Sequence, residues 1–201
     1  MGIVTLVSGG LDSTVMSLLA QEEGLELHPL FVDYGQRAVT AEWQACKALS
    51  KRHKLPIPTK IDLAGFGKRV PSGITSARRD VVAEAFLPGR NLLLLLAGSA
   101  YAVAVGANEV AIGLLDEKQR LFEDQSRDFL ARAEALLRTA TAIPITVRAP
   151  LIEFSKRDVL ELARRRNVRG TYSCHAGTKP PCGKCLSCRE RLNAEGGQDG
   201  R

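Results

Sequence analysis

The chain has 201 residues, enough for one domain with a hydrophobic core, and 45% of them are apolar, which argues against an intrinsically disordered chain. Its net charge of +6 suits an anionic ligand such as a nucleotide, and a solvated basic surface explains it equally well. No basic run with interleaved aromatic residues indicates nucleic-acid binding, and the longest apolar run, 92–97, is too short to span a bilayer. No signal-peptide pattern opens the chain. We therefore expect a cytoplasmic protein with no nucleic-acid or membrane partner.

The first expected elements are a strand at 3–7 and a helix at 13–23, joined by a glycine turn. The segment that holds this turn consists of Ser8, Gly9, Gly10, Leu11, Asp12, Ser13 and Thr14. Its glycines let the backbone approach an oxyanion, its hydroxyls donate hydrogen bonds, and the helix directs its positive end to the same place. The segment predicts a phosphate-binding loop. The alternative is an ordinary Gly-Gly turn capped by Asp12.

Strands and helices then alternate along the chain. Further strands are expected at 27–32, 57–61, 110–113 and 145–148, and further helices at 38–53, 91–105, 124–138 and 155–167. The helix at 91–105 is apolar on nearly all sides, so we expect it to be buried. The alternation predicts an α/β fold, a parallel five-stranded sheet with helices on both faces. Ligands bind such sheets at the carboxyl ends of the strands, where segments 8–14 and 33–36 both lie.

Three segments fall outside this alternation. Segment 63–88 is rich in glycine and arginine, and we interpret it as a long loop that could act as a lid. Segment 171–192 carries a cysteine cluster, and we expect residues 193–201 to be a disordered tail. We therefore divide the chain into an α/β domain at 1–170, a small cysteine module at 171–192 that packs on it, and the tail.

Four of the five cysteines, Cys174, Cys182, Cys185 and Cys188, fall within fifteen residues. Thiolates separated by two residues can wrap one tetrahedral ion, and four sulfurs favour a structural zinc, with an iron–sulfur cluster as the alternative. His175 could replace a ligand, but its position next to Cys174 makes simultaneous binding awkward. The fifth cysteine, Cys46, is most simply a small buried residue of a helix.

Several blocks of the sequence together resemble one enzyme family. They are residues 6–14, 32–37, 88–91 and 171–191, with Pro150, Leu151 and Lys156 at further matching positions. On these motifs the chain resembles the 7-cyano-7-deazaguanine synthases, the nitrile-forming enzymes of the queuosine pathway, within the ATP pyrophosphatase (PP-loop) superfamily. The resemblance covers about residues 3–192. It implies a fold like that of the adenine nucleotide alpha hydrolases, bound zinc and a homodimer.

The resemblance also implies an activity, that of an ATP-dependent carbon–nitrogen ligase. In this family ATP, with Mg²⁺, adenylates 7-carboxy-7-deazaguanine and releases pyrophosphate. Ammonia then displaces AMP to give an amide, and a second activation dehydrates the amide to the nitrile. The partners that the resemblance implies are therefore a small deazaguanine acid and ammonia.

The same resemblance assigns roles to individual residues. The nucleotide would be bound by Ser8, Gly9, Gly10, Asp12, Ser13, Thr14, Asp33, Tyr34, Gln36 and Arg37. Asp12, Ser13, Arg90 and Lys156 would be catalytic, and Arg90 and Lys156 would neutralise phosphate charge during adenylation. The alternatives are a surface loop position for Arg90 and a surface helix position for Lys156. Asp33 orients magnesium or a hydroxyl, or it caps the following helix.

The sequence departs from the family pattern at 122–126 and at Ala38. In the first region Asp124 keeps a family carboxylate that could accept hydrogen bonds from a guanine-like edge, while the family Pro, Cys and Arg are missing. Arg127 could replace the arginine as the partner of a substrate carboxylate. Two alternative functions therefore stay open. One is a divergent, defence-associated enzyme that joins a deazaguanine-type acid to another amine, such as a protein amine; the other is a non-catalytic nucleotide-binding module.

Overall fold

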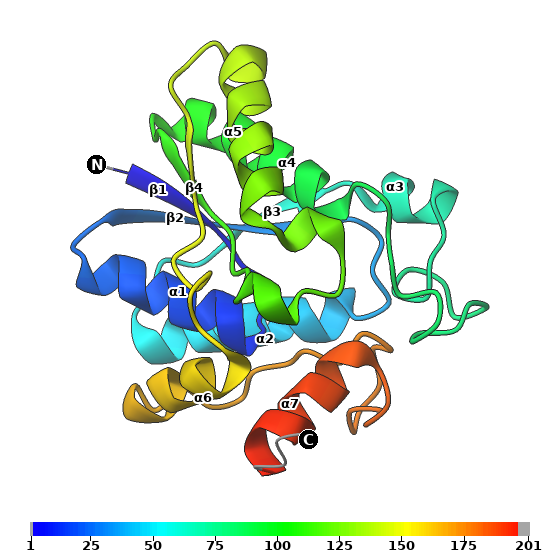
Figure 1. Ribbon diagram of the computed structural model, residues 1–201. Helices are drawn as coiled ribbons and strands as arrows, with labels where there is room; N and C mark the ends of the chain where they lie inside the picture. Colours follow the sequence, from blue (N-terminus) through cyan, green and yellow to red (C-terminus); the bar gives the residue numbers. More distant parts are fainter. Residues whose placement is uncertain (1, 197–201) are drawn as a thin grey trace.

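A parallel five-stranded sheet forms the centre of the molecule, whose structure is a computed structural model that describes residues 2–196 (Figure 1). The strands are β1 (Gly2–Leu6), β2 (Glu26–Asp33), β3 (Thr59–Asp62), β4 (Glu109–Ala111) and β5 (Thr146–Arg148). Their order is β3-β2-β1-β4-β5, and all four neighbouring pairs are parallel. The predicted α/β fold is therefore confirmed.

Helices cover both faces of this sheet. They are α1 (Leu11–Glu22), α2 (Val39–His53), α3 (Ala64–Arg69), α4 (Arg90–Val105), α5 (Arg127–Thr141), α6 (Lys156–Arg165) and α7 (Leu186–Gly196). Two short 3-10 helices, η1 (Glu117–Gln119) and η2 (Glu123–Gln125), precede α5. Figure 1 shows α4 and α5 on one side of the sheet and α1, α2 and α6 on the other. None of the helices within residues 2–196 has the length and apolar character needed to cross a membrane.

The alternating side chains of β1 connect the two halves of the core. Val4 and Leu6 pack in the cluster that contains Leu95 of α4 and Leu137 of α5. Ile3 packs in the other cluster, with Val15 of α1 and residues of α6. Because successive side chains of a strand point to opposite faces, β1 must be apolar on both, as a central parallel strand requires.

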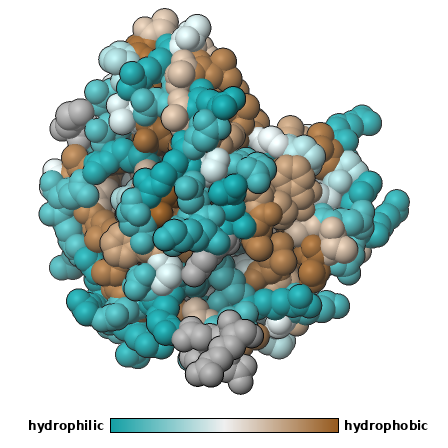
Figure 2. Space-filling view, in the orientation of Figure 1, coloured by the Kyte–Doolittle hydropathy of each residue, from teal (hydrophilic) through white to brown (hydrophobic). Residues whose placement is uncertain are grey.

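Two helices differ from the sequence-based expectation. Helix α5 begins at Arg127 rather than at 124, because the Ser126 side chain accepts a hydrogen bond from the Phe129 amide (3.1 Å) and caps the helix there. The prediction that α4 is buried nearly all round is wrong for one face. Leu96 and Val103 are 45% and 44% exposed. In Figure 2 apolar side chains gather to the right of α5, on the side where Figure 1 draws α4.

The segments outside the alternation are more ordered than expected. Segment 63–88 contains α3, and Ile74, Ala85 and Leu87 form a small apolar cluster with Phe66 and other side chains. The interpretation of this segment as a simple loop is therefore wrong. Helix α7 continues to Gly196, so the expected tail is helical at 193–196, and residues 197–201 lie outside the described part.

Candidate active site and metal centre

A cavity of about 290 Å³ opens beyond the carboxyl ends of β1, β2 and β4. Residues Leu6–Ser8, Leu30–Val32 and Ile112–Asp116 contribute to its wall at the ends of these strands. The amino ends of α1 and α4 and the first turns of α7 complete it. The cavity lies where ligands bind open parallel sheets, and seven of the predicted site residues line it. These are Ser8, Gly10, Asp12, Ser13, Tyr34, Gln36 and Arg90.

The glycine loop is held tightly between β1 and α2. Gly9 has φ +72°, and a Cβ there would lie 2.6 Å from the backbone oxygen of Glu42, so only glycine fits. The Ser8 amide donates to Ser13 Oγ at 3.2 Å, and the Gly10 amide donates to Ser8 Oγ at 3.3 Å. The Thr14 hydroxyl instead donates to the Gly10 carbonyl at 2.7 Å and supports the loop from behind. The loop therefore presents serine hydroxyls and the amino end of α1 to the cavity, a geometry that suits an oxyanion.

Lys156, at the start of α6, is 7% exposed and forms ion pairs with two carboxylates. Its Nζ lies 2.9 and 2.8 Å from the two carboxylate oxygens of Asp12 and 3.3 Å from Glu190 Oε2. Burial disfavours the charged amine, but the two carboxylates outweigh burial and raise its pKa. Lys156 is thus a buried cation beside the glycine loop rather than a surface lysine. Glu190 lines the cavity as well and was not among the predicted site residues.

A second polar group surrounds Arg90 at the amino end of α4. Gln36 Oε1 accepts a hydrogen bond from the Tyr34 amide (2.9 Å), and Gln36 Nε2 donates to Glu42 Oε2 (3.0 Å). Burial raises the pKa of Tyr34 to about 12 although Arg90 opposes it, so the phenol stays neutral at physiological pH. Burial likewise raises the pKa of Glu42 to about 7, against the hydrogen bond from Gln36 and the charge of Arg90. Glu42 was not predicted, because a glutamate in an amphipathic helix is usually exposed.

Four predicted nucleotide-binding residues are not part of the cavity wall: Gly9 and Thr14 of the glycine loop, and Asp33 and Arg37 further along the chain. Asp33 forms an ion pair with Lys60 (2.8 Å), and its Oδ1 accepts a hydrogen bond from the Gly35 amide (3.1 Å). It does not cap α2, whose N-cap position is Ala38. The Arg37 guanidinium donates to the Gly73 carbonyl (3.1 Å). Both side chains hold the loops that carry Tyr34 and Gln36 in place.

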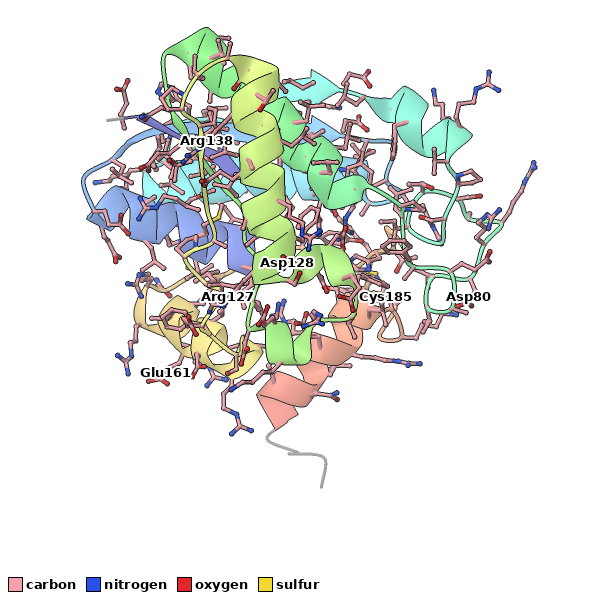
Figure 3. The ribbon with its side chains drawn as sticks, turned by 45° about the horizontal axis from the view of Figure 1, so that its top comes forward. Asp80, Arg127, Asp128, Arg138, Glu161 and Cys185 are labelled. Atoms are coloured by element: carbon pink, nitrogen blue, oxygen red, sulfur yellow. The ribbon has the colours of Figure 1, made fainter. Side chains whose placement is uncertain are left out.

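Neither of the two predicted substrate-binding residues, Asp124 and Arg127, is among the described residues that line this cavity. Asp124, in η2, accepts a hydrogen bond from the Asn91 side chain at its backbone oxygen (2.9 Å). Its Oδ1 is buried without a hydrogen-bond partner among residues 2–196, and burial raises its pKa. Arg127 pairs with Glu153 and does not line the cavity formed by the described residues. Figure 3 shows Arg127 on the α6 side of α5, away from Cys185.

The four clustered cysteines converge at the start of α7. The sulfur atoms of Cys174, Cys182, Cys185 and Cys188 all lie within 4.8 Å of one another. The Cys182 amide donates to Cys174 Sγ (3.2 Å), and the Cys185 amide donates to Cys182 Sγ (3.4 Å). Such N–H···S bonds stabilise thiolates, and four thiolates at these separations fit a tetrahedral metal ion or a cluster. Cys46 is buried elsewhere, in α2, as predicted.

The cysteine module also forms one wall of the cavity. Helix α7 begins at Leu186, between two of the clustered cysteines, and carries Glu190 to Lys156. The Tyr172 amide donates to the Gly9 carbonyl at 2.8 Å. His175 lines the cavity, and burial lowers its pKa to about 4, so its imidazole is neutral. A metal held by the cysteines would therefore also fix the position of cavity side chains.

Comparisons with known proteins agree with this architecture. A family model described as "Queuosine biosynthesis protein QueC" matches residues 2–196. The 7-cyano-7-deazaguanine synthase of Methanothermobacter thermautotrophicus is 31% identical over 211 residues, covering 96% of this chain and 94% of that protein. The synthase of Prochlorococcus marinus is 32% identical over 206 residues, covering 95% and 91%.

Among solved structures, the chain is similar to the U34-tRNA thiolase NcsA from Methanococcus maripaludis with its [4Fe-4S] cluster. The TM-score is 0.52 with 15% identity, and the match covers 99% of this chain and 65% of the thiolase chain. At this identity the likeness concerns the fold alone.

Proposed function

Because the chain belongs to the QueC family of queuosine biosynthesis proteins, we propose that it is an ATP-dependent carbon–nitrogen ligase of that pathway. Its substrates would be 7-carboxy-7-deazaguanine and ammonia, and its product, formed through the amide, 7-cyano-7-deazaguanine. The observation that carries the proposal is a phosphate-type glycine loop that shares the wall of one cavity with Arg90, while Lys156 is paired with Asp12 of that loop.

The first step would be adenylation of the substrate carboxylate. A carboxylate is a poor electrophile because oxide is a poor leaving group, and an acyl-adenylate exchanges it for a stabilised phosphate. The carboxylate oxygen attacks the α-phosphorus of ATP, and the bond to the β-phosphate oxygen breaks as pyrophosphate leaves. The hydroxyls of Ser8 and Ser13 and the amides at the start of α1 would hold the pyrophosphate, and Lys156 and Arg90 would neutralise its charge.

Magnesium would accompany ATP at the same place. The Asp12 carboxylate lines the cavity, and carboxylate oxygens are preferred ligands of Mg²⁺. The ion would neutralise part of the charge on the leaving pyrophosphate.

The later steps would use the same residues twice. Ammonia attacks the acyl carbon, a C–N bond forms, the C–O bond to AMP breaks with its electron pair on the phosphate oxygen, and one proton of the ammonia is lost. The amide oxygen then attacks the α-phosphorus of a second ATP, pyrophosphate leaves, and the amide nitrogen loses one proton. Loss of AMP together with the remaining N–H proton gives the nitrile.

Recognition of the deazaguanine would fall to η2 and its neighbours. The buried Oδ1 of Asp124 has no partner within the described chain, as expected of a carboxylate that accepts hydrogen bonds from a ligand N–H. Phe122 lines the cavity and contacts Phe86, with ring centroids 4.9 Å apart, and offers an aromatic face for a purine-like ring.

For the cysteine cluster we propose a structural zinc. The four sulfurs would fill a tetrahedral coordination sphere. The thiolase that shares the fold carries a [4Fe-4S] cluster, so metal analysis of the purified protein must distinguish the two. One zinc per chain supports the proposal, whereas iron with inorganic sulfide contradicts it.

Two observations favour a second candidate, an enzyme that stops at an amide. Arg127, the expected partner of a substrate carboxylate, is paired with Glu153, and the family arginine at 122–126 is missing. Both features support a substrate or product that differs from that of the nitrile-forming enzymes. Mass spectrometry of the products from ATP, Mg²⁺, 7-carboxy-7-deazaguanine and ammonia separates the candidates. A nitrile supports the synthase, an amide or acyl-adenylate without nitrile supports the conjugating enzyme, and the absence of AMP argues against both.

A further inference from the structure

The cavity contains a buried carboxylate, Glu42, that has no role in the adenylation and dehydration steps of the proposed reaction. It lies in the first turn of α2, and its residue is 9% exposed. It lines the cavity, and its backbone oxygen is the atom that a side chain at Gly9 would strike. Glu42 is therefore a buried carboxylate of the cavity wall, next to the glycine loop.

A hydrogen bond holds the Glu42 side chain in place, and neighbouring titratable groups influence its pKa. Its Oε2 accepts one hydrogen bond, from Gln36 Nε2 at 3.0 Å. The titratable groups that influence it are Asp33 at the end of β2, Tyr34 directly after it, Arg90 of α4, Cys46 one turn further along α2, and Tyr172 beside the cysteine module. Arg90 is the cation within this set, and the tyrosines and the buried thiol are neutral at physiological pH. The charges around the site are thus the carboxylates of Glu42 and Asp33 and the cation of Arg90, a set that can accept one further small cation.

We propose that Glu42 forms an ammonium site and takes a proton from the bound ammonium, which releases ammonia beside the acyl-adenylate. The inference rests on the proposed function, since it assigns the amine-handling residue of that reaction. In the step, an N–H bond of ammonium breaks and its proton passes to a Glu42 oxygen. The lone pair of the resulting ammonia forms the C–N bond, the C–O bond to AMP breaks, and the remaining proton leaves with the phosphate.

Two properties of the site support this role. Ammonium is the dominant form at neutral pH and has no lone pair, so an amine ligase must deprotonate it where water is scarce. A general base works best when its pKa lies near the working pH, and burial brings the pKa of Glu42 to about 7. A proton taken from ammonium can therefore return to solvent before the next turnover.

The test compares Glu42→Gln with the wild-type full-length chain in three assays. Acid-dependent exchange of pyrophosphate into ATP reports adenylation without any amine, and we expect it to stay within about twofold of wild type. Amide formation from ammonium chloride at neutral pH should fall on the order of a hundredfold. Hydroxylamine is neutral at this pH and needs no base, so hydroxamate formation should stay close to wild type. Glu161→Gln, an exposed glutamate of α6 (Figure 3), is the matched control and should change none of the three.

The possible results separate the inference from the proposed function. Equal losses with ammonium and hydroxylamine would show that Glu42 has only a structural role, and an unchanged rate with ammonium would show that it has none. Absence of exchange in the wild type would overturn the proposed function itself, since that assay does not involve Glu42.

If Glu42→Gln does not fold, the pH dependence of the wild type provides the test. At fixed total ammonium, amide formation should be level above pH about 7 and fall below it as Glu42 becomes protonated. A rate that rises with pH throughout, in parallel with free ammonia, would contradict the inference.

Discussion

Replacement of Lys156 by methionine tests the buried ion pairs beside the glycine loop. Methionine keeps most of the aliphatic volume but leaves the carboxylates of Asp12 and Glu190 without their shared cation. Removal of one partner from a fully buried pair costs about 3–5 kcal/mol. The side chains of Asp12 and Glu190 are 27% and 43% exposed, so water stabilises part of their charge. We therefore expect the free energy of unfolding to fall by about 2 kcal/mol, which lowers Tm by about 4–8 °C in a domain of this size.

The same variant should lose adenylation, because Lys156 is the cation placed against Asp12. We expect pyrophosphate exchange to fall on the order of a hundred- to a thousandfold. Lys60→Met is the matched control. Lys60 also pairs with a carboxylate at 2.8 Å, that of Asp33, but it is 35% exposed, and Asp33 does not line the cavity, whereas Asp12 does. The Tm of Lys60→Met should change by less than that of Lys156→Met, and Lys60→Met should keep its exchange activity. Circular dichroism melts measure Tm for both variants, and the exchange assay measures adenylation. A Lys156→Met protein with unchanged Tm and unchanged exchange would refute the role given to Lys156.

Three further substitutions probe other parts of the site. Gly9→Ala should abolish pyrophosphate exchange and lower the free energy of unfolding by at least about 2 kcal/mol. The control Gly24→Ala, with φ +73° and nothing within 4 Å of its new Cβ, should lower the free energy of unfolding by only about 1 kcal/mol and keep exchange activity. Similar chemical-denaturation curves for the two variants would be contrary evidence. Cys185→Ser should lower both the amount of bound metal, measured by elemental analysis, and Tm, while Cys46→Ser should keep the full metal content. Unchanged metal content in Cys185→Ser would contradict a metal site at the four cysteines. Arg127→Ala should leave the KM for the deazaguanine acid unchanged in steady-state kinetics, since Arg127 is paired with Glu153, and a large rise in KM would instead place it at the substrate.

The parts of the site that the sequence predicted are those specified by local chain geometry. The glycine loop follows directly from a strand, two glycines and a helix start, so its place at the sheet edge needs no long-range information. The cysteine cluster is likewise local, because cysteines so close in the sequence can bring their sulfur atoms to one point without help from distant segments. The parallel sheet followed from the alternation of apolar strands and amphipathic helices.

The missed features depend on packing between distant segments. Glu42 and Glu190 resemble surface glutamates of helices, and only the fold buries them, one beside Gly9 and the other beside Lys156. The substrate-binding role of Arg127 remains a prediction; its ion pair with Glu153, 26 residues away, could not be predicted from the sequence. The division of the chain at residue 170 remains a prediction, and the close packing of Tyr172 on the glycine loop ties the two parts together.

The central claim is that the glycine loop supports adenylation of a deazaguanine acid. The most direct measurement is exchange of labelled pyrophosphate into ATP, with and without 7-carboxy-7-deazaguanine, for the wild type and for Asp12→Ala and Ser13→Ala. We predict exchange in the wild type that requires the acid, and none in either variant although both remain folded. Normal exchange in both variants, or no acid-dependent exchange in the folded wild type, would contradict the account.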